Sequence, residues 1–296
     1  MRHLHKYLRA IGFSNIKKRK DLIELIKMVV SSPTNKNYVT KDENIIQVEI
    51  CKEFTSSVGM SICGEYDEND VFNYEYSYPF IKGTTISSRE DISIERHGDK
   101  ESYAGICDDI KIGVSLIFYL QNMIDYLKEQ SQGKLPINNT SLTLSGLSIQ
   151  GSIILPVIKN EKQVKKYKQA AINRNHLIAA ARRGDEEAIE SLTLEDIDTY
   201  TVLSKKILKE DVFSLVDTYF MPYGIECDKY SILGEIEACY LQKNSVTEEE
   251  IYVLTINCND LIFDVGINKK DLWGEPKPGR RFKGIVWLQG YINFPN

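Results

Sequence analysis

The stretch GRRFKGIVWLQGYINFPN, residues 279–296, runs from paired arginines into an apolar segment that carries Trp287, Tyr291 and Phe294. Such a stretch is either a basic, aromatic binding surface or a strand of the core. Its β-branched and aromatic residues favour the strand. We therefore interpret most of it as a core strand and keep only the preceding loop as a candidate surface.

A second segment of the chain resembles this strand. IQGSIILP at 149–156 echoes LQGYINFP at 288–295, and each copy has a central Gly and a terminal Pro. The echo is consistent with a duplication of two β-rich parts or with convergent strand chemistry, and an echo this short does not separate the two.

The residues upstream of the terminal strand predict a small barrel. Four further segments have the composition of strands and are separated by turns, namely SLVDTYFMPYG at 214–224, YSILGEIEACYLQKN at 230–244, IYVLTINCN at 251–259 and LIFDVGIN at 261–268. Five strands of this kind predict a closed or nearly closed barrel, similar in outline to an OB fold, over residues 211–296.

The first half of the chain predicts helices packed on an antiparallel sheet. Two apolar stripes indicate N-terminal helices that end near Gly12 and Pro33. Period-two segments from residue 44 to 80 predict a meander, and DISIERHG with ESYAGI predicts a hairpin. The apolar spacing over 112–127 predicts one long amphipathic helix, and strands return up to residue 158.

Between these parts the sequence predicts a helical connector over 159–210. The Lys-rich residues 159–170 are the best candidate for a domain boundary, and Gly184 ends a helix. Thr193 to Asp196 match a capping box in front of another helix. The expected class is therefore α+β, with an α+β domain over 1–158, the connector, and the barrel-like domain over 211–296.

Composition and charge exclude several classes of protein. Of the 296 residues, 42% are hydrophobic, and the net charge of −5 argues against general affinity for nucleic acid without excluding a local site. The N-terminal residues lack the apolar core of a secretory signal, and no run of about 18 apolar residues occurs. We expect a cytoplasmic protein with no membrane partner. The six cysteines form no C-x-x-C pair and are expected to be free, buried thiols.

The densest polar cluster is ERHGDKESYAGICDD, residues 95–109. His97, Asp108 and Asp109 could bind a divalent metal or transfer protons if the strands bring them together. The alternative is structural, because the two aspartates precede a predicted helix and His97 lies in a predicted hairpin turn. No metal-binding spacing, cofactor fingerprint or nucleophile motif is present, so the sequence predicts neither a metal nor a cofactor.

The loop GEPKPGRR, residues 274–281, is the second candidate site. Lys277, Arg280 and Arg281 lie between Trp273 and Trp287, a composition suited to a small anion or a single strand of nucleic acid. The alternative is that the tryptophans pack in the barrel while the cations are solvated at its mouth.

Several segments carry a resemblance to a known family. MPYGIECD at 221–228, LIFDVGINKKDLWGEP at 261–276, GRRFKGIVWLQG at 279–290 and HLHKYLRAIGFS at 3–14 resemble uncharacterised cytoplasmic proteins of Gram-positive anaerobic bacteria, catalogued only as a domain of unknown function. The resemblance covers the whole chain and implies a bacterial intracellular protein, with no activity or site residues to transfer.

The sequence favours a non-catalytic binding or assembly module, because no catalytic constellation is evident. Its partner would be a protein, a nucleic acid strand or a small anion. The alternative is an enzyme with a site between the two β-rich parts that uses His97 with Asp108 and Asp109. Whether the chain is an enzyme stays open at this point.

Overall fold

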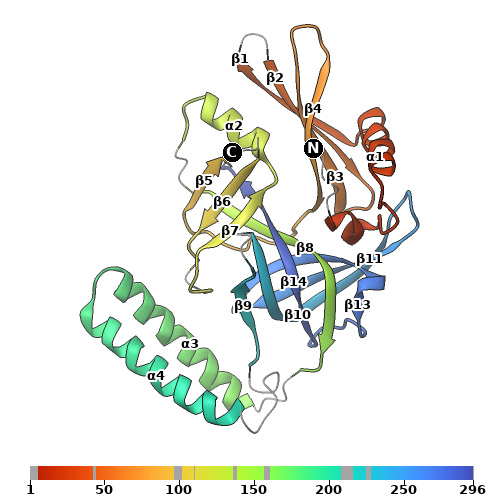
Figure 1. Ribbon diagram of the computed structural model, residues 1–296. Helices are drawn as coiled ribbons and strands as arrows, with labels where there is room; N and C mark the ends of the chain where they lie inside the picture. The colour runs from red at the N-terminus through yellow and green to blue at the C-terminus, as the bar shows by residue number, and fades with distance from the viewer. Residues whose placement is uncertain are drawn as a thin grey trace.

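The computed structural model describes residues 6–42, 45–96, 102–109, 111–135, 139–156, 161–207, 216–224 and 228–295. The described chain folds into a four-stranded antiparallel sheet, a larger sheet that closes into a barrel, and a helical hairpin beside them (Figure 1). The predicted α+β class is confirmed.

The four-stranded sheet follows two N-terminal helices, as predicted. The elements are the 3₁₀ helix η1 (Lys6–Ile11), α1 (Arg19–Ser31), β1 (Asn35–Asp42), β2 (Ile45–Glu53), β3 (Val58–Tyr66) and β4 (Phe72–Ile81). The strands pair in chain order, β1-β2-β3-β4. Gly12 has a φ of 92° directly after η1, a conformation that glycine adopts without steric cost. Strand β1 was not predicted, because NKNYVTKD is polar and lacks a clear alternation.

Five strands of the larger sheet form a closed barrel. They are β8 (Ser141–Ile154), β10 (Lys229–Lys243), β11 (Glu250–Cys258), β12 (Leu261–Asn268) and β14 (Arg281–Asn293). The antiparallel meander β10-β11-β12 continues to β8 through a parallel pairing, and β8 pairs with β14, which returns to β10. The predicted barrel is confirmed, but its fifth strand is β8 rather than the segment at 214–224.

The shorter strands extend this ring at its edges. β9 (Tyr219–Pro222) pairs with β10, and β13 (Leu272–Trp273) follows the 3₁₀ helix η2 (Lys269–Asp271) and pairs with β8. β7 (Leu116–Leu120), β6 (Tyr103–Cys107) and β5 (Ile92–Arg96) continue the sheet from β14. The predicted hairpin is therefore present as the antiparallel pair β5 and β6.

The long helix predicted over 112–127 is wrong. Its place is taken by strand β7 and the shorter helix α2 (Met123–Ser131). Leu116, Phe118 and Leu120 are buried at every second position, so this apolar run has the period of a strand as well as that of a helix.

The connector consists of two helices, α3 (Glu161–Arg182) and α4 (Glu186–Ile207). Gly184 lies in the turn between them with a φ of 86°. The Lys-rich residues from 161 to 168 lie within α3. The capping box at Thr193 is wrong as a helix start, because α4 runs through it and the Thr193 hydroxyl donates to the carbonyl of Ile189 at 2.8 Å.

The two echoing segments lie on β8 and β14, which pair with each other. The register places Leu288 opposite Gly146 and Asn293 opposite Ser141, so the echoing residues are not opposite one another. The two similar segments therefore belong to paired strands of one barrel. Whether their similarity records a duplication stays a prediction.

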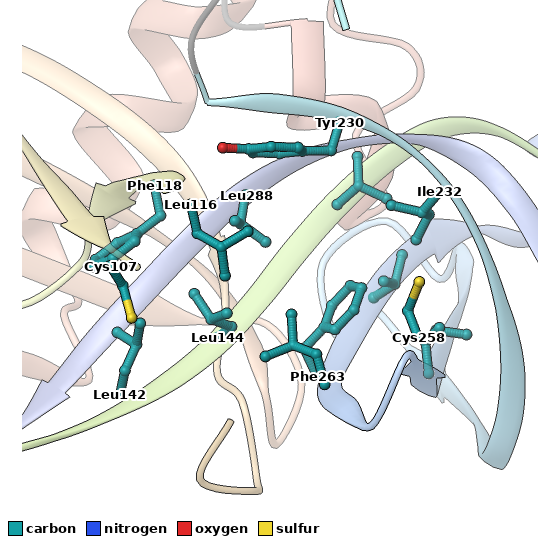
Figure 2. Close-up of a cluster of buried hydrophobic side chains, with 14 of the residues drawn as sticks. Cys107, Leu116, Phe118, Leu142, Leu144, Tyr230, Ile232, Cys258, Phe263 and Leu288 are labelled. Atoms are coloured by element: carbon teal, nitrogen blue, oxygen red, sulfur yellow. The ribbon is translucent and has the colours of Figure 1, made fainter. Parts of the chain in front are cut away.

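Apolar side chains fill the barrel and the space beside it. Figure 2 shows part of the first cluster, in which Leu144, Tyr230, Phe263 and Leu288 from four barrel strands converge with Phe118 of β7. A second cluster packs η1 and α1 against the four-stranded sheet and the outside of the barrel through Trp287 and other residues. These two cores fix the four-stranded sheet beside the barrel.

Candidate functional site

A polar cleft of about 390 Å³ lies where the four-stranded sheet meets α2 and the ends of β8 and β14. Residues of β1 to β4 form one wall, and residues of α2, β8 and β14 form the other. In Figure 1, α2 lies beside the β1–β2 end of the four-stranded sheet. Clefts of this size suit a small molecule.

The side chains of β2 alternate between two faces of the sheet, and one of these faces lines the cleft. Val48 and Ile50 pack in the core with α1, whereas Glu49 and Cys51 alternate with them and line the cleft. Glu49 is only 4% exposed. A carboxyl group this deeply buried loses its hydration, so its neighbours decide its charge.

The surroundings of Glu49 favour its neutral form. Burial raises its pKa from an ordinary value of 4.5 to about 7, although hydrogen bonds from Tyr78 and Ser61 act in the opposite direction. The nearby charge of Asp125 raises the pKa further. At neutral pH this carboxyl group therefore exchanges readily between its acid and its ionised form.

The Tyr78 hydroxyl links Glu49 to the opposite wall. It lies 2.5 Å from Glu49 Oε1 and 2.9 Å from the carbonyl oxygen of Gln121. Tyr78 has one hydroxyl proton, so at any one time it donates that proton either to the Glu49 carboxylate or to the Gln121 carbonyl. The Tyr78 hydrogen bond therefore opposes the rise in the pKa of Glu49, and burial causes that rise.

Cys51 is unsuited to act as a nucleophile. Its Sγ lies 3.0 Å from Ser61 Oγ, and burial raises the pKa of its thiol to about 12. The thiolate is the reactive form of cysteine, and this site suppresses it at neutral pH.

Charged groups at the cleft are mainly acidic. Asp125 of α2 accepts a hydrogen bond from the Tyr291 hydroxyl at 3.4 Å. Glu53 forms an ion pair with Lys82 at 2.5 Å, so the one lysine of the lining is already paired. The lining therefore has an excess of carboxyl groups over cations.

Two side-chain amides hold the two walls of the cleft in place. Gln121 Nε2 donates to Gln289 Oε1 at 2.8 Å and to the carbonyl of Ile81 at 2.9 Å. Gln289 is fully buried in β14 and donates to the carbonyl of Pro79 at 2.8 Å. The cleft is consequently built on rigid strands, which preorganises it for a ligand.

The candidate acid–base residues of the sequence lie elsewhere. His97 lies outside the described residues. Asp109 is buried and accepts hydrogen bonds from the Ser88 hydroxyl at 2.6 Å and the Lys111 amide at 2.9 Å. Asp108 accepts from the Ser115 hydroxyl. Both aspartates therefore organise the turn before strand β7 and not the start of a helix, and neither lines the cleft.

The candidate cations at 277–281 differ from one another. Lys277 Nζ lies 2.9 Å from Glu275 Oε2, and Arg280 Nη1 donates to the Glu275 carbonyl at 2.7 Å. Arg281 is buried, and its guanidinium donates to the carbonyls of Leu155 and Val216 at 2.8 to 3.1 Å. Arg281 thus ties together the chain before α3 and the chain after α4. An anion site at this loop stays a prediction.

The sequence did not single out Glu49, although a signal was present. In QVEIC, residues 47–51, polar residues alternate with residues of the core, and a buried strand seldom carries a carboxylate at such a position. Gln121 and Gln289 gave no signal, because isolated glutamines are ordinary surface residues.

Two absences apply to the residues that the structure describes. No group of three or more His, Cys, Asp or Glu residues among them could hold a metal ion. No helix among them is long and apolar enough to cross a membrane. The five cysteines within those ranges, Cys51, Cys63, Cys107, Cys239 and Cys258, are free thiols.

The family comparison agrees with the resemblance in the sequence. A family model described as "Domain of unknown function, E. rectale Gene description (DUF3881)" matches residues 8–290. The chain belongs to the DUF3881 family. Neither the curated proteins nor the solved structures include a match to this DUF3881 chain. The family description names no activity, so the function of this member is argued from its cleft.

Proposed function

We propose that this DUF3881 protein is a binding module that holds a small, cationic or hydrogen-bond-donating ligand in the Glu49 cleft. The observation that carries the proposal is a buried carboxyl group that lines a cleft of about 390 Å³. An ammonium or guanidinium group placed there would pair with Glu49 and favour its ionised form.

The charge balance of the lining favours this ligand class over an anion. Glu49, Glu53 and Asp125 line the cleft with a single lysine, and that lysine is paired with Glu53. Tyr78, Phe80 and Tyr291 add aromatic surface, which attracts cations as well. An anionic ligand would meet repulsion at the same place.

The test is a ligand screen by thermal shift and calorimetry at about pH 8, where Glu49 is mainly ionised. Primary amines and guanidines are compared with carboxylates and phosphates of similar size. We expect binding of cations that Glu49→Gln abolishes, whereas Glu275→Gln, at the remote 274–281 loop, leaves it intact. Binding of anions alone, or binding that Glu49→Gln does not weaken, would contradict the proposal.

A second candidate function is proton transfer by Glu49. A carboxyl group with a pKa of about 7 is matched to general acid–base catalysis at neutral pH, and Tyr78 provides a hydroxyl in contact with it. Turnover of a bound amine by the wild type, lost in Glu49→Gln and kept in Glu275→Gln, would favour this candidate. Tight binding without turnover favours the binding module.

A further inference from the structure

The α3–α4 hairpin is set apart from the two sheets. The two helices pack on each other, and neither makes a comparable contact with any other described element (Figure 1). Arg174 Nη2 and Asp196 Oδ1 join the helices at 2.7 Å. Arg182 adds one contact to the body, since its Nη1 lies 3.5 Å from the carbonyl of Asp108.

The hairpin carries apolar side chains that its own packing leaves exposed. Ile189 is 48% exposed, and Leu194 and Ile197 are each 58% exposed. At about 100° per residue these three positions fall within an arc of roughly 140°, centred opposite the buried Ala188. They form an apolar stripe on the outer side of α4, which a lone hairpin does not bury.

The charges of the two helices are opposite and unevenly distributed. α3 contains six basic residues and one acid, and four of the basic residues are lysines in its first eight positions. α4 contains six acids, all between Glu186 and Asp198, and its two lysines follow near its end. Because the helices are antiparallel, the hairpin is basic near its base and acidic toward its turn.

We propose that this hairpin is a self-association surface, on which a second copy of the chain packs its hairpin in the antiparallel sense. A two-fold pair brings the acidic half of each hairpin against the basic half of the other. The apolar stripe of Ile189, Leu194 and Ile197 on each copy is buried in the resulting four-helix arrangement. A parallel pair would place like charges together.

A second copy of the chain accounts for the order of charges along the hairpin, which a different partner would not. A partner of one charge sign would complement only half of the hairpin, whereas the same chain supplies both signs in the required order. Each helix of 22 residues is about 33 Å long, which provides a continuous contact surface without contribution from the sheets.

The experiment measures the mass of the full chain by light scattering and by sedimentation. We expect a dimer of the 33.9 kDa chain. Ile189→Ser/Leu194→Ser/Ile197→Ser should reduce it to the monomer, while the control Tyr240→Ser/Leu241→Ser, at exposed apolar positions of β10, should remain a dimer. Circular dichroism verifies that each variant is folded.

Reversing the charges of the hairpin tests whether two copies pair in the antiparallel sense. Lys162→Glu/Lys165→Glu/Lys166→Glu and Glu186→Lys/Glu187→Lys/Glu190→Lys should each be monomeric alone at low salt, and their mixture should recover the dimer. A wild-type monomer at all concentrations, a dimer that the serine variant leaves unchanged, or a mixture of the two charge variants that stays monomeric would each overturn the proposal.

Discussion

The barrel and the cleft each bury a carboxyl group, and they treat it in opposite ways. Asp264 in β12 is 2% exposed and accepts three hydrogen bonds of 2.7 Å from Thr84 N, Thr84 Oγ1 and Thr255 Oγ1. Glu49 in β2 is as deeply buried, but its partners are hydroxyl groups that also serve as acceptors. Asp264 is thus held by donors within the fold, whereas Glu49 lines a cleft that a ligand can enter.

The largest effect is expected at the satisfied group. Asp264→Ala removes three hydrogen bonds to a carboxylate and leaves the Thr84 amide without its partner. Hydrogen bonds to charged groups contribute about 1.5 to 3 kcal/mol each, and we expect a loss of about 4 kcal/mol in the free energy of unfolding. Urea denaturation measures it; a loss below about 1 kcal/mol would show that Asp264 is not a structural anchor.

Glu49→Gln is expected to stabilise the protein at alkaline pH. Because the folded pKa of about 7 lies above the ordinary value of 4.5, the native state holds its proton longer than the unfolded state does. Wild-type stability is therefore lost as the pH rises between these values, by about 3 kcal/mol in total.

Glu49→Gln should remove this loss, so the variant gains over the wild type at about pH 8 and not at about pH 4. Denaturation of both proteins across this range provides the comparison. Parallel stability curves for the two proteins would mean that folding does not shift the pKa of Glu49.

Arg281 and Arg280 also differ in their surroundings, because the first is buried among backbone carbonyls and the second lies at an exposed contact. Arg281→Ala should cost about 2 kcal/mol of unfolding free energy, because its buried guanidinium satisfies backbone carbonyls on both sides of the hairpin. Arg280→Ala, at the exposed contact with Glu275, should cost about 0.5 kcal/mol or less. Equal losses, measured by thermal unfolding, would remove the distinction between them.

The last expected effect is on ligand binding. A cationic ligand requires ionised Glu49, so its affinity should fall about tenfold between pH 8 and pH 6, as the carboxyl group with a pKa of about 7 takes up its proton. Calorimetry in buffers of different ionisation enthalpy should show a proton released on binding at pH 6. Binding that strengthens toward acid pH would contradict the assigned role.

The sequence predicted the elements that depend on local pattern and missed those that depend on distant pairing. The hairpin of β5 and β6 and the meander β10-β11-β12 follow from alternation between turns. The parallel pairing of β8 with β12 follows from no local signal, so the fifth barrel strand was assigned to residues 214–224. The same applies to the cleft, because Glu49 and Gln121 acquire their roles only when Tyr78 connects their two elements.

Closure of the barrel by β8 and β14 has a consequence for the synthesis of the chain. Asn293 pairs with Ser141 across 152 positions, so β8 leaves the ribosome well before its partner strand exists. At about 5 to 20 residues per second, this interval lasts on the order of ten seconds. During that time β8 has unpaired edges, and the β14 strand of a neighbouring nascent chain could occupy the place that its own β14 will take.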